Sequence, residues 1–187
     1  MDKLTDLDKK IIATNMHGRK FSIENSLCVA HRCKWGYPQV IMTSPIFKNG
    51  EPCPTLFWLV CPYLEKVCGK LESNAGVTEL EAIFKQRPKE IATLHEEYKN
   101  LRIEVAKKYI KTWNVIDDKL KESLTQKGIG GINTNVCPTA AKCLHLQLAT
   151  LLGLGHHPAE NWFKEKLENF SCACESCSDV AKDSYQI

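Results

Sequence analysis

The alternation of hydrophobic and polar residues divides the chain into two halves of different character. In the first half, segments 26–33 and 39–43 are short, hydrophobic and separated by a turn around Gly36. A third hydrophobic segment, 54–60, follows a turn at Gly50. Such runs between glycine and proline predict strands, so we expect a small antiparallel sheet here.

Hydrophobic residues in the second half recur at helical spacing. Pro62 and Pro88 stand where helices begin, because proline lacks the N–H group that a first-turn residue leaves unpaired. The helix after Pro88 carries a hydrophobic stripe, and a break near Trp113 ends it. Predicted helices cover residues 4–13, 62–73, 77–86, 89–113, 138–152 and 159–170, with one more that ends at 124.

Together these segments predict an α+β fold, with a small antiparallel sheet in the N-terminal half packed by several helices from the C-terminal half. The chain has 187 residues, of which 43% are hydrophobic, and this suits one domain with a substantial core. We place that domain at residues 1–170 and expect a cysteine-rich C-terminal tail at 171–187.

Charge and hydropathy narrow the classes of protein to consider. A net charge of +3 does not indicate a nucleic-acid partner. The sequence contains no apolar run long enough for a membrane span, and its charged N-terminus lacks a signal core. We therefore expect a cytoplasmic protein with reduced thiols, in which cysteine clusters serve metal binding or catalysis.

Ten cysteines are the strongest chemical signal in the chain, and three of them crowd the tail as Cys172, Cys174 and Cys177. Zinc takes four tetrahedral ligands, so the tail is one ligand short. An iron–sulfur cluster binds the same thiolates. The sequence predicts a zinc or iron–sulfur site here, and the alternative is an oxidisable tail without metal. Candidates for the missing ligand are His156, His157, Cys137 or another chain.

A second group of candidates comes from the predicted sheet. Residues two apart on a strand share a face, so His31 and Cys33 point together while Arg32 lies on the other face. With Cys61, which follows the third predicted strand, they offer ligands for a second metal site.

Cys61 is also a candidate nucleophile, because it precedes a proline at the start of a predicted helix. The N–H groups and dipole of a helix N-terminus stabilise a thiolate and lower its pKa. His31 or His145 would act as the base, and Arg32 or Lys142 would bind an anionic group. The alternative for Cys61 is a buried residue that only caps the helix.

The segment Lys142-Cys143-Leu144-His145 is expected to be helical, within the helix predicted from residue 138. On a helix, residues two positions apart are rotated by about 200° from each other, so Cys143 and His145 would not easily bind one ion. One of Cys143 and His145 then faces the site and the other packs in the core. Because Lys142 and His145 share a face, we favour these two toward the site and Cys143 in the core.

Several motifs recur in a known family: His31-Arg32-Cys33, the run 54–58 followed by Cys61-Pro62, Leu71-Glu72, and Lys142-Cys143-Leu144-His145. In this combination the chain resembles DUF501, a family of uncharacterised bacterial proteins, over about residues 26–160. The resemblance implies no activity, but such proteins are often encoded near a septum-formation protein. Cys53 and the tail depart from the family pattern.

The family context suggests a third kind of function, a non-catalytic partner protein of the cell envelope or division machinery. The helix predicted at 89–113 would then present a docking face for a protein partner. An exposed hydrophobic patch on that helix would favour this hypothesis, and a buried stripe would argue against it.

Overall fold

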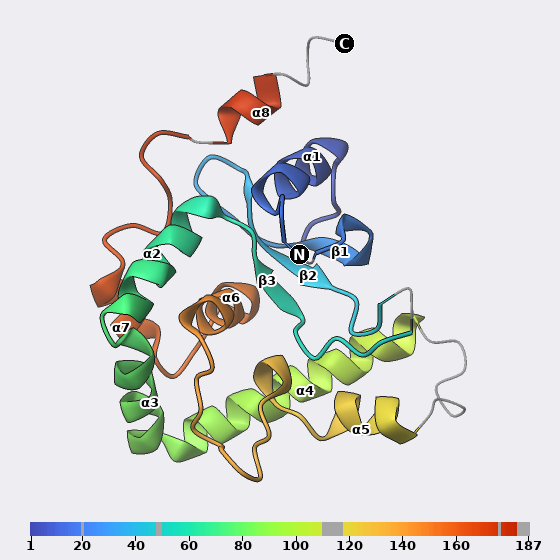
Figure 1. Ribbon diagram of the computed structural model, residues 1–187, viewed down its shortest axis with the longest axis vertical. Helices are drawn as coiled ribbons and strands as arrows, with labels where there is room; N and C mark the ends of the chain where they lie inside the picture. Colours follow the sequence, from blue (N-terminus) through green and yellow to red (C-terminus); the bar gives the residue numbers. More distant parts are fainter. Residues whose placement is uncertain (20, 48–49, 110–117, 176, 183–187) are drawn as a thin grey trace.

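The computed structural model describes residues 1–19, 21–47, 50–109, 118–175 and 177–182 (Figure 1). The helices are α1 (Asp6–Asn15), α2 (Pro62–Ser73), α3 (Gly76–Gln86), α4 (Pro88–Tyr109), α5 (Asp118–Thr125), α6 (Leu144–Leu154), α7 (Glu160–Lys166) and α8 (Ser178–Lys182). The strands are β1 (Ser26–Arg32), β2 (Pro38–Thr43) and β3 (Phe57–Leu59), with short 3-10 turns η1 (Ile23–Asn25) and η3 (Ile129–Gly131). The predicted α+β fold is confirmed.

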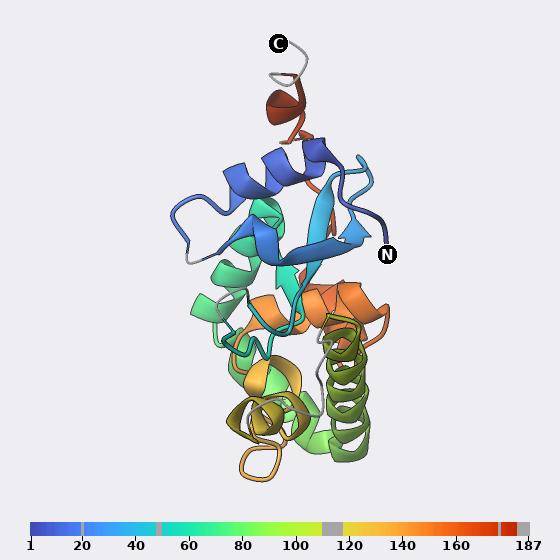
Figure 2. The same cartoon turned by 90° about the vertical axis from the view of Figure 1, so that its right-hand side faces the viewer.

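The sheet is antiparallel with strand order β1-β2-β3, and helices cover both of its faces (Figures 1 and 2). All six residues of β2 are buried. Val40 and Met42 belong to the main core with α6, whereas Ile41 packs in a smaller core with Ile12 of α1. Because side chains alternate across a strand, β2 supplies both cores.

Helix α6 lies at the centre of the helical layer and contacts all three strands and α2 (Figure 1). Most of its residues are buried, as expected for a helix that is hydrophobic all round. Close packing against β3 fixes Gly153, where an added Cβ would lie 2.5 Å from the Phe57 ring. Helix α6 therefore packs tightly against the sheet.

The start of α6 differs from the prediction. A helix from residue 138 was expected, but α6 begins at Leu144, after a loop. Lys142 has φ 68°, in the left-handed region that no right-handed helix can contain. The predicted start is wrong because the backbone leaves the helical region at Lys142, whose Nζ bonds the Gly130 carbonyl at 2.7 Å.

The predicted docking helix corresponds to α4, and its residues 110–113 lie outside the described residues. The hydrophobic stripe of α4 faces the core of this protein. Ile91, Leu94, Tyr98 and Val105 are buried, and Leu101 is half-buried. The exposed patch that would favour a docking face is thus missing from the described part of α4. Nor does any described helix combine the length and hydrophobicity of a membrane span.

Arg102 anchors α4 to the glycine-rich loop before η3. Its side chain is fully buried, and burial lowers its pKa. The guanidinium donates to carbonyl oxygens of Pro54, Leu124, Lys127 and Gly128. One side chain thereby joins α4, the end of α5 and the segment before β3.

Candidate functional site

The candidate residues gather in two places. One is a pocket at the N-terminal end of α6, and the other is the contact between the tail and the β1–β2 turn. The pocket contains Cys143 and His145, which sequence spacing had separated. The tail contact involves Cys33 and Cys61 from the core, in addition to the tail cysteines.

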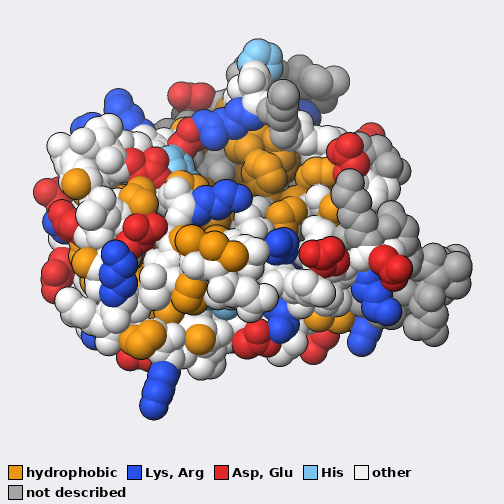
Figure 3. Space-filling model, turned by 60° about the horizontal axis from the view of Figure 1, so that its bottom comes forward, with side chains coloured by type: hydrophobic (Ala, Val, Ile, Leu, Met, Phe, Trp, Pro, Cys, Tyr) orange, Lys and Arg blue, Asp and Glu red, His pale blue; other side chains and the backbone are white. Residues whose placement is uncertain are grey.

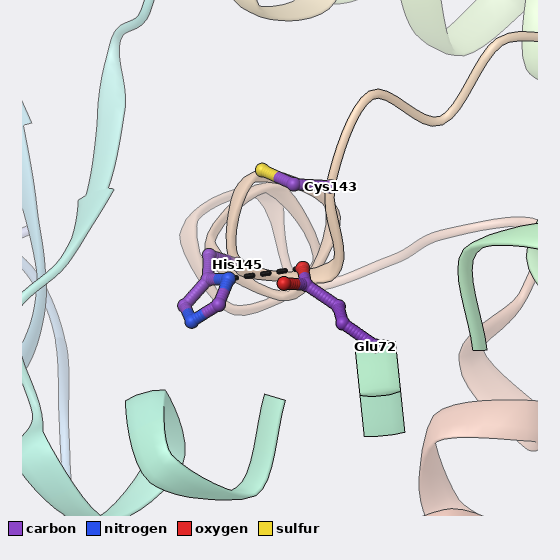
Figure 4. Close-up of side chains that lie close together, drawn as sticks. All are labelled: Glu72, Cys143 and His145. Atoms are coloured by element: carbon purple, nitrogen blue, oxygen red, sulfur yellow. Dashed lines mark hydrogen bonds and ion pairs between the residues drawn. The ribbon is translucent and has the colours of Figure 1, made fainter. Parts of the chain in front are cut away.

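At the first place, Glu72, Cys143 and His145 converge (Figure 4). Their potential ligand atoms all lie within 4.8 Å of one another, and within the described parts of the chain no other group of three such residues does so. Cys143 is the N-cap of α6, with extended φ −159° and ψ 157°, so its side chain does not follow helical spacing. The premise that this segment is helical is wrong at Cys143, so helical spacing does not separate Cys143 from His145. Glu72 reaches them from α2.

Hydrogen bonds fix the imidazole of His145 at both nitrogens. Nε2 lies 3.2 Å from the Glu65 carbonyl oxygen, which only accepts, so Nε2 carries a proton. Nδ1 lies 3.0 Å from Glu72 Oε1, and the Leu144 N–H donates to the same oxygen at 2.6 Å. An unprotonated Nδ1 facing a carboxylate oxygen would bring two acceptors together. A proton or a cation must therefore stand between them.

The surroundings of His145 favour the charged form of its ring. A hydrogen bond with Cys143 raises the pKa of His145 most, burial lowers it, and the Glu72 carboxylate raises it further. The net effect is a pKa above the ordinary value. Without metal, the three residues thus suit an imidazolium between a thiol and a carboxylate.

Cys143 and His145 open onto a pocket of about 400 Å³. Figure 3 shows a hollow on this side of the molecule with hydrophobic side chains in its floor and basic side chains at its rim. Phe57 and Trp58 of β3 supply apolar lining, and Lys142 supplies a cation. Arg19 also lines the pocket but is paired with Glu65. The pocket is large enough for a small molecule.

At the second place, the tail lies along the turn that joins β1 and β2. The Lys34 N–H donates to Ser171 Oγ at 3.1 Å, and Trp35 Nε1 donates to the Cys172 carbonyl at 2.9 Å. Tyr37 donates its hydroxyl to Glu175 at 3.1 Å. Three residues of the turn thus bond the tail through a backbone amide or a side chain, and Cys33 opens the same turn.

Two amide side chains connect Cys61 to the tail. Gln39 Nε2 lies 3.9 Å from Cys61 Sγ and donates to the Phe170 carbonyl. Asn15 Nδ2 donates to the Val60 carbonyl at 3.2 Å and lies 3.9 Å from Cys177 Sγ. Helix α8, which follows Cys177, contacts α1. The tail thus returns to the end of β3.

Burial reverses the expected acidity of Cys61. Cys61 does cap α2, and backbone N–H groups there lower its pKa, but burial has the larger effect and raises the pKa above the ordinary value. Burial also raises the pKa of Cys177, and the thiols of Cys61, Cys33 and Cys172 act in the same direction. The predicted lowering at Cys61 is wrong because the helix end lies inside the core.

The other sheet candidates have structural partners. Arg32 forms a two-pronged pair with Asp8, at 2.7 and 2.9 Å, and donates to Asp2 at 3.0 Å. This pair joins β1 to α1 and engages the guanidinium that was expected to bind an anion. His31 Nδ1 lies 3.1 Å from Gln39 Oε1, so described hydrogen bonds connect it to Cys61 only through Gln39.

The proposed extra ligands for the tail lie in other settings. His156 is exposed and pairs with Glu97 at 3.0 Å. His157 is buried, with Nε2 bonded to Gln147 at 3.0 Å and Nδ1 accepting from an amide at 3.1 Å. Cys137 is exposed on the loop before α6. Described contacts bring Cys33 and Cys61 to the tail cysteines instead.

Sequence reasoning missed three polar residues of these clusters. Glu72 appeared only within a family motif, and a helical glutamate usually faces solvent. Gln39 and Asn15 gave no signal, because their role comes from neighbours distant in the chain. Only the inward position of Gln39 on a strand, where it is 1% exposed, separates it from an ordinary surface residue.

Comparison with known proteins gives one match. The model of DUF501, a family of proteins of unknown function, matches residues 29–165, which include Glu72, Cys143, His145, Cys33 and Cys61 but not the tail cysteines. Neither a curated protein nor a solved structure matches the chain. Because the match spans most of the sequence, the chain belongs to the DUF501 family.

Proposed function

We propose that this protein binds a zinc ion through Glu72, Cys143 and His145 and uses it as a Lewis acid toward a small molecule in the adjoining pocket. The convergence of three potential ligand atoms within 4.8 Å carries this proposal. Carboxylate, thiolate and imidazole are all zinc ligands. A zinc ion would also occupy the place between His145 Nδ1 and Glu72, where two acceptors face each other.

The neighbouring contacts support a metal-binding role for His145. Histidines that bind metals usually donate their second ring N–H to a carbonyl or carboxylate, which fixes the tautomer. His145 Nε2 makes such a contact with the Glu65 carbonyl. The Leu144 N–H in turn orients the Glu72 carboxylate.

The mixed donor set favours zinc over the other metals considered. Iron–sulfur clusters are held mainly by thiolates, and calcium and magnesium prefer oxygen ligands. Zinc with three protein ligands keeps a fourth position for water or substrate. Such a zinc ion lowers the pKa of bound water to about 7 or polarises a carbonyl group.

The residues that line the pocket suggest which kind of ligand would bind at the open coordination position of the zinc ion. Phe57 and Trp58 offer contact for an apolar body, and Lys142 offers a cation for an anionic group. The Lys142 ammonium is already held by the Gly130 carbonyl, so it is fixed near the site before any ligand binds. A small molecule with a carbonyl or phosphate group would suit this arrangement.

Metal analysis of the full chain, purified without air and without a histidine tag, tests the proposal. We expect His145→Gln and Glu72→Gln each to contain about one zinc ion per chain less than wild type. Cys137→Ser, a cysteine variant on an exposed loop, serves as the control and should keep the wild-type content. Equal zinc in His145→Gln, Glu72→Gln and wild type would exclude this site.

A second candidate function is cysteine chemistry with Cys143 as the nucleophile, because Cys143 is half-buried, borders the pocket and bonds His145. It replaces the hypothesis that Cys61 attacks with His31 or His145 as base, since Cys61 is buried. Protein free of zinc, in which iodoacetamide labels Cys143 faster than Cys137 at pH 7, would favour it over the zinc site.

A further inference from the structure

We propose a second metal site, in which Cys33, Cys61, Cys172 and Cys177 bind one zinc ion and fasten the tail to the sheet. This site is separate from the pocket and uses ligands from three parts of the chain. It would be structural, because four thiolates complete the tetrahedral coordination of zinc and leave no open position.

The argument begins with the turn that Cys33 opens. The Gly36 N–H donates to the Cys33 carbonyl at 2.9 Å, and the Cys33 N–H donates to the Tyr37 carbonyl at 2.9 Å. Gly36 has φ 85°, which closes the turn in a conformation that side chains disfavour. Cys33 is thereby held in a rigid turn, and Trp35 of that turn bonds the backbone of Cys172.

The opposite side of the site is formed by Cys61 and Cys177. Asn15 bonds the carbonyl of Val60, the neighbour of Cys61, and its amide nitrogen also faces Cys177 Sγ. One amide therefore holds Cys177 beside the residue that precedes Cys61. A second amide, that of Gln39, faces Cys61 Sγ and also donates to the backbone carbonyl of Phe170, the residue just before the tail.

These amides also suit a metal-bound state. N–H groups directed at sulfur, as at Cys61 and Cys177, stabilise thiolates around a metal. Binding would replace four S–H bonds by four S–Zn bonds and release four protons, which leaves a site of charge −2. None of the described cysteines forms a disulfide.

Metal binding would also change the position of the tail. Only the Glu72 cluster has its ligand atoms within 4.8 Å among the described residues, so the four sulfurs must draw closer. Cys33 and Cys61 belong to rigid elements, whereas Cys172 and Cys177 belong to the tail. The ion would therefore pull the tail against the turn.

Zinc content of four full-length proteins, prepared without air, tests the second site independently of the first. We expect about two zinc ions per chain in wild type and in Cys137→Ser, and about one in Cys177→Ser and in His145→Gln. Unchanged zinc in Cys177→Ser would overturn the tail site. A single zinc ion that is lost in Cys177→Ser but kept in His145→Gln would support the tail site and exclude the pocket site.

X-ray absorption at the zinc edge of His145→Gln gives a second readout that does not need a tail variant. We expect a shell of sulfur alone at about 2.3 Å. A shell containing nitrogen or oxygen at about 2.0–2.1 Å would overturn the four-thiolate assignment. Iron with labile sulfide, lost in Cys177→Ser, would replace the zinc assignment by an iron–sulfur cluster.

Discussion

Replacement of Arg102 by methionine tests how strongly its buried guanidinium stabilises the contact between α4 and the glycine-rich loop before η3. Methionine occupies a similar volume and keeps the apolar stem, but it removes the guanidinium. The acceptors that lose their donor are the carbonyls of Pro54, Leu124, Lys127 and Gly128. Because these acceptors are backbone carbonyls, methionine supplies no new donor for them.

The size of the effect follows from the burial of those contacts. The bonds to Leu124 and Gly128, at 3.0 and 2.9 Å, are buried. An unsatisfied buried carbonyl costs about 1–3 kcal/mol, so two of them cost about 2–6 kcal/mol. Removal of a buried charge offsets part of this loss. We expect the free energy of unfolding to fall by about 3 kcal/mol and Tm to fall by roughly 6–12 °C.

Urea unfolding followed by circular dichroism, at a fixed zinc concentration, measures this loss. The matched control is Arg87→Met, which also removes a bond to a backbone carbonyl, at 3.0 Å to Pro158, but from an exposed side chain. We expect the control to lose less than about 1 kcal/mol. Equal losses in the two variants, within about 0.5 kcal/mol, would refute the argument from buried carbonyls.

Two further predictions concern packing and pH. Gly153→Ala places a Cβ against the Phe57 ring and should lower the free energy of unfolding by about 1–3 kcal/mol. Gly69 has open space around it, so the control Gly69→Ala should raise the free energy of unfolding by about 0.5–1 kcal/mol. Equal effects of the two variants in urea unfolding would contradict the packing of α6 on β3. Burial lowers the pKa of His157 to about 3, so below pH 6.5 the unfolded chain binds a proton that the folded chain does not. The free energy of unfolding should therefore fall by up to about 1.4 kcal/mol per pH unit from this residue as the pH drops from 6.5 toward 3. His157→Gln should flatten that slope; an unchanged slope in this variant would show that His157 does not contribute to the pH dependence.

Much of the fold could be predicted from local sequence patterns. The antiparallel sheet and most helices follow from hydrophobic spacing and from proline and glycine at element ends. Helix α2 begins at Pro62 as predicted. Strand β3 is shorter than the hydrophobic segment 54–60, because part of that segment packs as irregular backbone whose N–H groups meet the Tyr98 hydroxyl.

The candidate sites were harder to predict from the sequence, because each depends on contacts between residues far apart in the chain. Cys143 and His145 share a pocket because the backbone leaves the helical region at Lys142, whose ammonium bonds the Gly130 carbonyl 12 positions earlier. Glu72 reaches His145 across 73 positions of sequence. The tail motif predicted a metal site that lacks one ligand, but spacing alone could not identify Cys33 and Cys61 as residues near the tail.

The proposed zinc ligands in the pocket can be tested most directly by X-ray absorption on Cys177→Ser, which keeps the pocket residues and lacks one ligand of the proposed tail site. We predict about one zinc ion per chain, with one sulfur at about 2.3 Å and nitrogen or oxygen neighbours at about 2.0–2.2 Å. Zinc surrounded by sulfur alone, or Cys177→Ser protein without zinc, would contradict a metal bound by Glu72, Cys143 and His145.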